Sequence, residues 1–94
     1  MLVRIVKMTF VHENIAGFER LFREHKRKIR SFEGCTFLEL YQDKNDPCTF
    51  FTYSHWENEE NLTKYRHSPF FRSLWAKSKS LFSKKPEAWS LEKV

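Results

Sequence analysis

Residues that bend or crosslink a chain are scarce in this sequence, whose 94 residues include two Gly, three Pro and two Cys. They do not cluster, and we find no linker, internal repeat or low-complexity tract. A chain of this length suffices for one domain, so the sequence predicts a single domain over residues 1–94. A Rossmann dehydrogenase, a kinase and a TIM barrel are excluded because each needs a longer chain.

Long apolar runs are also missing. No stretch approaches the roughly 18 apolar residues that a membrane-spanning helix needs. The segment from Met1 to Lys7 has neither the sustained apolar run nor the small-residue cleavage site of a signal peptide. We therefore expect a cytoplasmic protein that does not bind membranes, with Cys35 and Cys48 reduced.

Aromatic residues and positive charge are abundant. Ten Phe, three Tyr and three Trp make up 17% of the chain, which suggests more apolar surface than one small core needs. A partner subunit or an apolar pocket would take up the excess. The net charge of +5 brings nucleic acid or acidic ligands into consideration, but charge bears on association rather than on the fold.

Four segments have the β-branched or alternating pattern of strands. Turn-forming residues at 43–47 separate the second from the third and predict a hairpin. In this hairpin Cys48 would pair near Gln42 and Cys35 near His55, so the two sulfurs would lie roughly 20 Å apart. That separation is beyond the reach of a disulfide. The predicted strands are 2–10, 35–42, 48–56 and 88–94.

Helix start signals precede three further segments. Asn14 is the expected N-cap of a helix that runs to about Arg30, with Gly34 near its C′ position. Asn58 would cap a short second helix. Ser68 and Pro69 would open a third, whose expected apolar residues are Phe70, Phe71, Leu74, Trp75, Leu81 and Phe82.

The order of these elements is strand–helix–strand–strand–helix–strand, the ferredoxin-like split βαβ pattern. We therefore predict an α+β fold: an antiparallel βαββαβ sheet with helices on one face. The opposite face is too apolar to be left in water, so we expect two sheets to pack face to face in a homodimer. The residues predicted on this face are Val3, Ile5, Phe37, Tyr41, Phe51 and Tyr53.

Three segments resemble the antibiotic biosynthesis monooxygenase family: residues 32–35, 55–62 and 65–71. The most specific piece is the Trp-Glu-x-Glu-Glu run that begins at Trp56, and residues 85–90 resemble a subgroup of the family. The order of elements also matches, so the resemblance covers essentially the whole chain. It implies a dimeric α/β barrel, in which each ferredoxin-like monomer has a pocket between its sheet and its helices.

The resemblance also implies a chemistry. Characterised members oxidise polycyclic phenols or quinols with O₂ and use neither a metal nor a flavin, because the substrate supplies the electrons. The protein then has to hold a deprotonated aromatic molecule in an apolar cavity and stabilise its oxyanion. We therefore expect a monooxygenase of a small aromatic or quinol substrate, with no cofactor and no metal.

Some family positions carry other residues in this sequence. The Asn and Tyr of polyketide-tailoring members correspond to Thr52 and Leu62. The haem-degrading branch has an Asn, a Trp and a haem-ligating His where this sequence has Val6, Tyr65 and Trp75. Haem degradation is therefore not expected.

Tyr65 and His67 are the predicted catalytic residues. Many quinol-oxidising relatives have a His at the position of Tyr65, whose phenol would hydrogen-bond a substrate oxygen here. His67 would act as a base, a role that histidine side chains commonly have in enzymes. The alternatives are a core tyrosine with its hydroxyl at the surface and an exposed loop histidine. The predicted substrate-binding residues are Val6, Thr52, Trp56, Phe71 and Trp75.

The aromatic candidates have a simpler interpretation as well. Trp56 matches a family Trp on the third strand, and it equally fits a core residue at the strand-to-helix corner. Trp75, Phe71 and their aromatic neighbours form either a ligand cage or a core stripe at helical spacing. By its parity, His55 points to the dimer side of the sheet.

Two other classes of site receive little support. The four His and two Cys lack the spacing of a zinc site. The basic run at 25–30 suggests RNA, but it interleaves with an apolar stripe as on a solvated helix face, and the strands lack an RNA-binding signature. We therefore expect no nucleic acid partner.

The alternative function is a non-catalytic dimeric module that binds a small molecule or is associated with stress. A gap between sheet and helices that is filled by side chains would favour this module. A cavity of roughly several hundred Å³ with Tyr65 at its wall would favour the enzyme.

Overall fold

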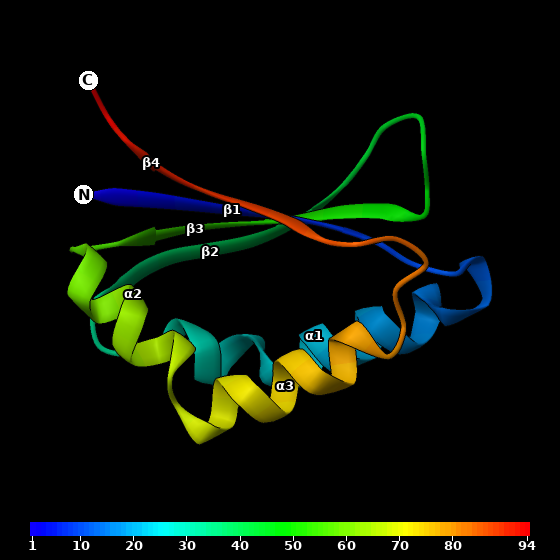
Figure 1. Ribbon diagram of the computed structural model, residues 1–94, viewed down its shortest axis with the longest axis horizontal. Helices are drawn as coiled ribbons and strands as arrows, with labels where there is room; N and C mark the ends of the chain where they lie inside the picture. Colours follow the sequence, from blue (N-terminus) through cyan, green and yellow to red (C-terminus); the bar gives the residue numbers. More distant parts are fainter.

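The computed structural model describes residues 1–94. It consists of a four-stranded antiparallel sheet with all helices on one side (Figure 1). The strands lie in the order β2-β3-β1-β4. This arrangement confirms the predicted α+β, ferredoxin-like fold. The strands are β1 (Leu2–Thr9), β2 (Cys35–Gln42), β3 (Thr49–Trp56) and β4 (Glu87–Glu92). The helices are the 3₁₀ turn η1 (His12–Asn14), α1 (Ile15–Arg30), α2 (Glu59–Arg66) and α3 (Pro69–Lys79).

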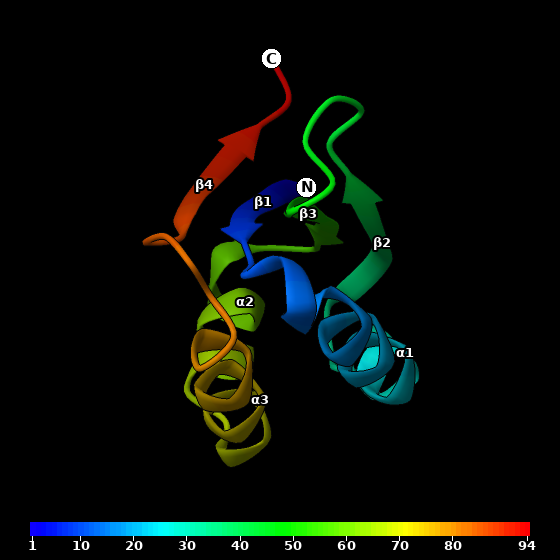
Figure 2. The same cartoon turned by 90° about the vertical axis from the view of Figure 1, so that its right-hand side faces the viewer.

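The two long helices, α1 and α3, lie side by side under the sheet and are separated from each other. Viewed along the strands, α1 lies beneath the β2 side of the sheet, and α3 lies beneath the β4 side (Figure 2). The inner face of the sheet therefore covers the space between them. None of the helices is both long and apolar enough to cross a membrane.

The starts of α2 and α3 form as their sequences predict. The Asn58 side chain accepts a hydrogen bond from the Asn61 backbone N–H at 2.8 Å, and Ser68 accepts one from the Phe71 N–H at 3.1 Å. Pro69 occupies the first turn of α3, where a missing N–H has no cost. These two caps mark the starts of α2 and α3, and Tyr65 and His67 lie in the segment between them.

The bounds of α1 are confirmed, since Asn14 is its N-cap and Arg30 is its last residue, whereas α3 is shorter than predicted. Asn14 stands at the N-cap of α1 without capping it, since its Nδ2 donates to the Leu81 carbonyl oxygen at 3.3 Å. Ser31 is the C-cap of α1, so Gly34 lies three residues beyond the cap rather than near the predicted C′ position. Helix α3 ends at Lys79, so Leu81 and Phe82 follow it.

The strand ends differ from the prediction by one or two residues. Phe10 lies beyond β1 and forms an isolated bridge with Phe82. Strand β3 begins at Thr49 rather than at Cys48, and β4 covers residues 87–92 rather than 88–94.

The predicted register of the β2–β3 hairpin is also wrong. Gln42 pairs with Phe50 rather than with Cys48, and Cys35 pairs with Trp56 rather than with His55. The connecting loop is longer than predicted and displaces the pairing by two residues at Gln42, and a β-bulge between positions 35 and 37 reduces this displacement to one residue at Cys35. Both cysteines are nevertheless free, as the predicted separation along the hairpin requires.

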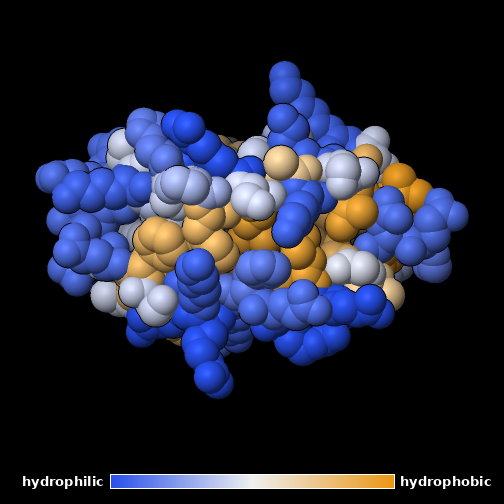
Figure 3. Space-filling model, turned by 90° about the horizontal axis from the view of Figure 1, so that it is seen from below, coloured by the Kyte–Doolittle hydropathy of each residue, from blue (hydrophilic) through white to orange (hydrophobic).

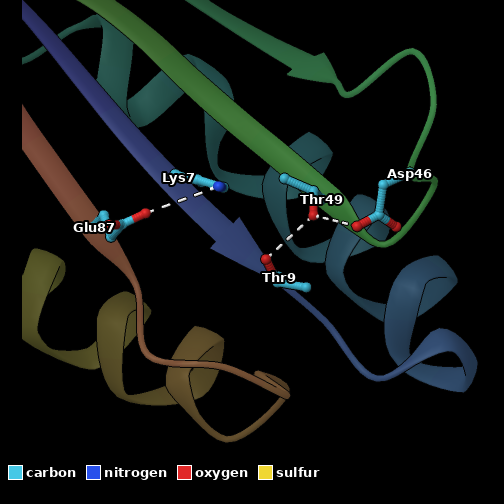
Figure 4. Close-up of polar contacts among 5 residues, drawn as sticks. All are labelled: Lys7, Thr9, Asp46, Thr49 and Glu87. Carbon is cyan, nitrogen blue, oxygen red and sulfur yellow. Dashed lines mark hydrogen bonds and ion pairs between the residues drawn. The ribbon is translucent and has the colours of Figure 1, made fainter.

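Carboxylates organise the longer loop. Asp43 Oδ2 accepts from the backbone N–H groups of residues 45 and 46, and Asp46 accepts from the Cys48 N–H. Thr49 Oγ1 donates to Asp46 Oδ2 at 2.8 Å and lies 3.2 Å from Thr9 Oγ1, which joins β3 to β1 (Figure 4). These acceptors keep residues 43–48 outside the ladder, which explains the register. On the other side of β1, an exposed ion pair between Lys7 and Glu87 spans 3.8 Å to β4.

The core consists of two buried clusters between the sheet and the helices. One surrounds Trp56 and includes Ile29, Leu38 and Tyr65. The other is aromatic: the Phe10 ring stacks on Phe18 at 4.1 Å between ring centroids and also contacts Phe50 and Phe82. The two clusters lie toward opposite ends of the sheet, so the region between them is separate from both.

The outer face of the sheet is uncovered in the monomer. Its aromatic side chains contact one another across strands, with Tyr53 at 5.9 Å from Phe37, 6.3 Å from Tyr41 and 5.1 Å from His55 between ring centroids. Tyr41 remains 51% exposed, and Trp89 on β4 remains 42% exposed. His55 is on this face, as its parity predicts.

Candidate functional site

A cavity of about 420 Å³ lies between the sheet and the helices. Its size is typical of a site for a small organic molecule. Fourteen of its 20 lining residues are hydrophobic. They come from β1, β2, β3, β4 and all three α-helices: Val6, Met8, Phe18, Leu21, Phe22, Ile29, Leu38, Trp56, Leu62, Tyr65, Phe71, Leu74, Trp75 and Ala88.

The helix side of the molecule shows the apolar character of this region. Seen from that side, hydrophobic residues form a band along the middle of the face, between two borders of hydrophilic residues (Figure 3). The cavity walls include residues of α1 and of α3, the two helices that flank this middle region. An apolar ligand would therefore be sheltered from water between the helices.

All seven predicted site residues lie on the wall of this one cavity. Strands β1 and β3 place two of them side by side, because Val6 is directly opposite Thr52 in the ladder. The α2–α3 segment supplies four more positions facing the sheet, and the end of β3 supplies the last. The seven residues are Val6, Thr52, Trp56, Tyr65, His67, Phe71 and Trp75.

Tyr65 is a buried polar residue of the cavity wall, enclosed by aromatic rings. Its ring is stacked on Trp56 at 5.1 Å and meets Phe32 and Phe71 edge to face at 4.9 and 5.0 Å. Burial, with a smaller contribution from Cys35, raises the pKa of Tyr65 above its ordinary value of 10. Its hydroxyl therefore stays protonated at neutral pH. A protonated hydroxyl at a cavity wall suits the predicted role of donating a hydrogen bond to a ligand.

His67 stands at the C-cap of α2, where the chain turns toward α3. It lines the cavity while remaining exposed. Its backbone N–H is bound by the Thr63 carbonyl at 3.0 Å, so the position of the residue is set by the end of the helix. An exposed imidazole at a cavity wall has access to both a bound ligand and bulk water, which is what a proton acceptor needs.

Trp56 is both a core residue and part of the wall. Only 1% of it is exposed, and it belongs to the larger core cluster. Its Nε1–H donates to Ser54 Oγ at 3.0 Å, and Ser54 in turn approaches the Arg4 carbonyl at 3.5 Å. The core interpretation of Trp56 is therefore correct, and its inner surface also bounds the cavity.

Phe71 and Trp75 form a less buried part of the wall. Both are half-buried, and their rings stack at 5.9 Å with an interplanar angle of 11°. Trp75 also meets Phe82 edge to face at 5.6 Å. The two interpretations of this aromatic stripe are compatible here, because one side packs in the core and the other faces the cavity.

The sequence prediction missed two charged residues of the wall. Arg4 on β1 and Arg66 at the end of α2 both line the cavity. A signal for each was present: Arg4 has the same strand parity as the apolar residues Val6 and Met8, and Arg66 immediately follows Tyr65. A charge on an otherwise apolar strand face is the pattern that would have identified Arg4.

The basic run at 25–30 makes contacts within its own chain. His25 Nδ1 lies 2.7 Å from the Leu21 carbonyl, and Lys28 Nζ lies 4.6 Å from the centre of the Phe70 ring. Arg30 donates to the Cys35 carbonyl. The structure contains no group of three or more His, Cys, Asp or Glu side chains placed to hold a metal ion.

Fold and cavity together define a class: small ferredoxin-like proteins with an apolar pocket between sheet and helices. A family model described as antibiotic biosynthesis monooxygenase matches residues 1–77. The chain therefore belongs to the antibiotic biosynthesis monooxygenase family. A comparison with curated proteins finds no match.

Solved structures with the same fold are numerous. A crystal structure of an antibiotic biosynthesis monooxygenase has a TM-score of 0.93 and 22% identity, with 100% of this chain and 99% of that chain covered. A conserved protein from Methanosarcina mazei Go1 has a TM-score of 0.93 and 21% identity, with coverage of 100% and 94%. Rv0793 from Mycobacterium tuberculosis has a TM-score of 0.90 and 15% identity, with coverage of 99% and 94%. At these identities the similarity shows the fold alone.

Proposed function

We propose that this protein is a cofactor-independent monooxygenase that oxidises a small aromatic or quinol substrate with O₂. The observation that carries the proposal is the cavity of about 420 Å³, apolar on most of its wall, with Tyr65 and His67 among its lining residues. Membership of the antibiotic biosynthesis monooxygenase family supports the class of reaction. Neither observation names the substrate, which the apolar wall limits to a mainly apolar molecule.

The proposed chemistry divides between two side chains. His67 accepts the proton of a substrate phenol, and the protonated Tyr65 hydroxyl donates a hydrogen bond to the resulting phenolate oxygen. The electron-rich ring then reacts with O₂ at a carbon that carries hydrogen. One oxygen atom becomes a carbonyl oxygen of the product, and the other leaves as water with the hydrogen of that carbon and the phenol proton that His67 accepted. All four electrons come from the substrate, which balances the reaction without a further reductant.

Oxygen uptake by purified, metal-depleted protein tests this function. With a panel of hydroquinones and polycyclic phenols, we expect saturable uptake above the spontaneous rate. Tyr65→Phe should lower kcat/KM by about 10- to 100-fold, because it removes the donor that stabilises the phenolate. Tyr41→Phe is the matched control, since it removes the same hydroxyl from a residue that is 51% exposed on the outer face of the sheet. Equal rates in the two variants would contradict the role of Tyr65.

The non-catalytic module remains the second candidate, and one observation favours it. Thr52 and Leu62 occupy the wall where polyketide-tailoring relatives would place an Asn and a Tyr. Saturable binding of aromatic ligands without any protein-dependent O₂ uptake would support the module. His67→Gln distinguishes the two candidates further, because losing the base should abolish turnover but leave ligand affinity within about threefold.

We propose further that two copies of the chain pair through the outer face of the sheet. This face carries a continuous set of aromatic rings around Tyr53, and the helices leave it uncovered. The side chain of His55 has a buried Nε2 atom without a hydrogen-bond partner, which an apposed chain would be placed to satisfy. The large apolar area and the orphaned nitrogen both favour a self-complementary interface.

Sedimentation equilibrium tests the dimer. We expect twice the chain mass of 11.5 kDa for the native protein and the chain mass itself for Phe37→Glu. The substituted carboxylate would be buried without a partner in the interface, which is strongly unfavourable. Ser73→Glu is the control, because it adds the same charge at an exposed position of α3. A native protein that sediments as a monomer would contradict the proposal.

A further inference from the structure

Two arginines share the cavity wall, and no acidic residue lines it with them. Arg4 reaches the cavity from β1, and Arg66 reaches it from the C-terminal end of α2. None of the 20 lining residues is Asp or Glu. The three ion pairs of the structure all use lysines that lie elsewhere. The wall therefore carries two guanidinium cations and no carboxylate that would neutralise them.

Arg4 has hydrogen-bond donors to spare. Its Nη1 donates to Ser90 Oγ at 2.9 Å, which uses one of the five N–H groups of a guanidinium. Burial, together with repulsion from Arg66, lowers the pKa of Arg4 from its ordinary value. Arginine nevertheless stays charged in proteins. Two cations of this kind at one wall are stabilised when an anion is placed between them.

The remaining polar groups of the wall are partly in use. Ser54 accepts the Trp56 N–H, and Ser78 donates to the Leu74 carbonyl at 2.9 Å. The groups left for a ligand are thus the two guanidinium groups, His67, the Tyr65 hydroxyl and Thr52. This set combines cationic donors with an apolar surround, so it suits a ligand with an apolar body and one negative group.

We propose that the substrate is an aromatic molecule with a permanent anionic substituent, such as a carboxylate or a sulfonate, which Arg4 and Arg66 bind. This inference rests on the proposed function and names its class of substrate. The arginines hold one end of the molecule by charge-assisted hydrogen bonds, and the ring lies in the apolar part of the cavity. The phenol to be oxidised is thereby directed toward Tyr65 and His67. Arg4 and Arg66 act as substrate-binding and specificity residues.

A pair of fluorescent probes tests this directly. 8-Anilinonaphthalene-1-sulfonate carries a sulfonate, and N-phenyl-1-naphthylamine has the same rings without it. In fluorescence titrations at low ionic strength, we expect Arg4→Gln and Arg66→Gln each to weaken sulfonate binding by about 5- to 20-fold. Affinity for the neutral probe should stay within about twofold, because the apolar wall is unchanged.

Two controls accompany the titrations. Arg72→Gln removes a guanidinium from an exposed position of α3 that does not line the cavity, so it should leave both affinities unchanged. The neutral probe reports whether the cavity of each variant is intact. Because Arg66 is exposed, Arg66→Gln keeps the proposal testable if Arg4→Gln fails to fold.

Two results would overturn the anionic substrate. One is an unchanged sulfonate affinity in both cavity variants, and the other is an equal loss for the two probes. Neither titration depends on O₂ chemistry. A chain that binds the sulfonate through its arginines but consumes no O₂ refutes the monooxygenase and keeps the anion site. A chain that oxidises quinols but binds the sulfonate equally well without the arginines refutes the anion site and keeps the monooxygenase.

Discussion

Replacing Trp56 by alanine is expected to lower the free energy of unfolding by about 3–5 kcal/mol. The indole is 1% exposed and belongs to the cluster that joins β3 to α2. Its loss removes the stacking on Tyr65 at 5.1 Å and leaves Ser54 Oγ without the donor that now lies at 3.0 Å. For a small domain this is a large fraction of the total stability. Urea unfolding followed by circular dichroism measures it.

Two further variants separate the causes of this loss. Trp56→Phe keeps an aromatic ring and removes the N–H donor, so we expect a loss of about 1–2 kcal/mol. Trp75→Ala removes a half-buried indole from the cavity wall and should cost less than Trp56→Ala, because less surface returns to water. Equal losses at the two positions would show that Trp56 is no more important to the core than the wall residue.

Gly34→Ala and Gly17→Ala are expected to change stability in opposite directions. Gly34 has φ of 87°, and an added Cβ would overlap the Asn61 side chain on α2. We expect a loss of about 2–4 kcal/mol from this strain and overlap. Gly17 lies on an exposed part of α1 with nothing within 4 Å of its added Cβ, so alanine should raise stability by about 0.5–1 kcal/mol. Chemical denaturation of both variants gives the two signs.

Gly34→Ala is also expected to alter the cavity. The Gly34 carbonyl accepts from the Glu57 N–H at 2.8 Å, which connects the turn after α1 to the start of α2. Displacing Asn61 would move the helix that carries Tyr65. A Gly34→Ala protein as stable as the native one would mean that the turn relaxes without strain, contrary to this expectation.

The elements that the sequence predicted well depend on neighbouring residues. The caps at Asn58 and Ser68 act within three residues, and both form as predicted. The stripe on α1 also repeats locally, and it buries Phe18 and Ile29. The errors arose where distant groups compete. Asn14 bonds a carbonyl 67 residues away instead of capping its helix, and Asp43 and Asp46 lengthen a loop whose turn residues alone predicted a shorter one.

The candidate site shows the same division. Resemblance to a family placed Tyr65, His67 and five other residues in one pocket, and the structure puts them all on one wall. The resemblance contained nothing about Arg4 or Arg66, whose proposed role in binding an anion depends on the absence of an acidic residue from the cavity wall. The lack of an acidic residue at the wall depends on all the helices and strands around the cavity, so no single segment of the sequence shows it.

The sequence by itself determined the order of the strands and helices, the family and the aromatic character of the interior. Periodicity, caps and short motifs carry this information, and each acts over a few neighbouring residues. Only the tertiary structure decided the hairpin register, the raised pKa of Tyr65 and the placement of two arginines at the cavity wall. These depend on burial and on contacts between residues that are far apart in the chain, because desolvation and charge act through space rather than along the sequence.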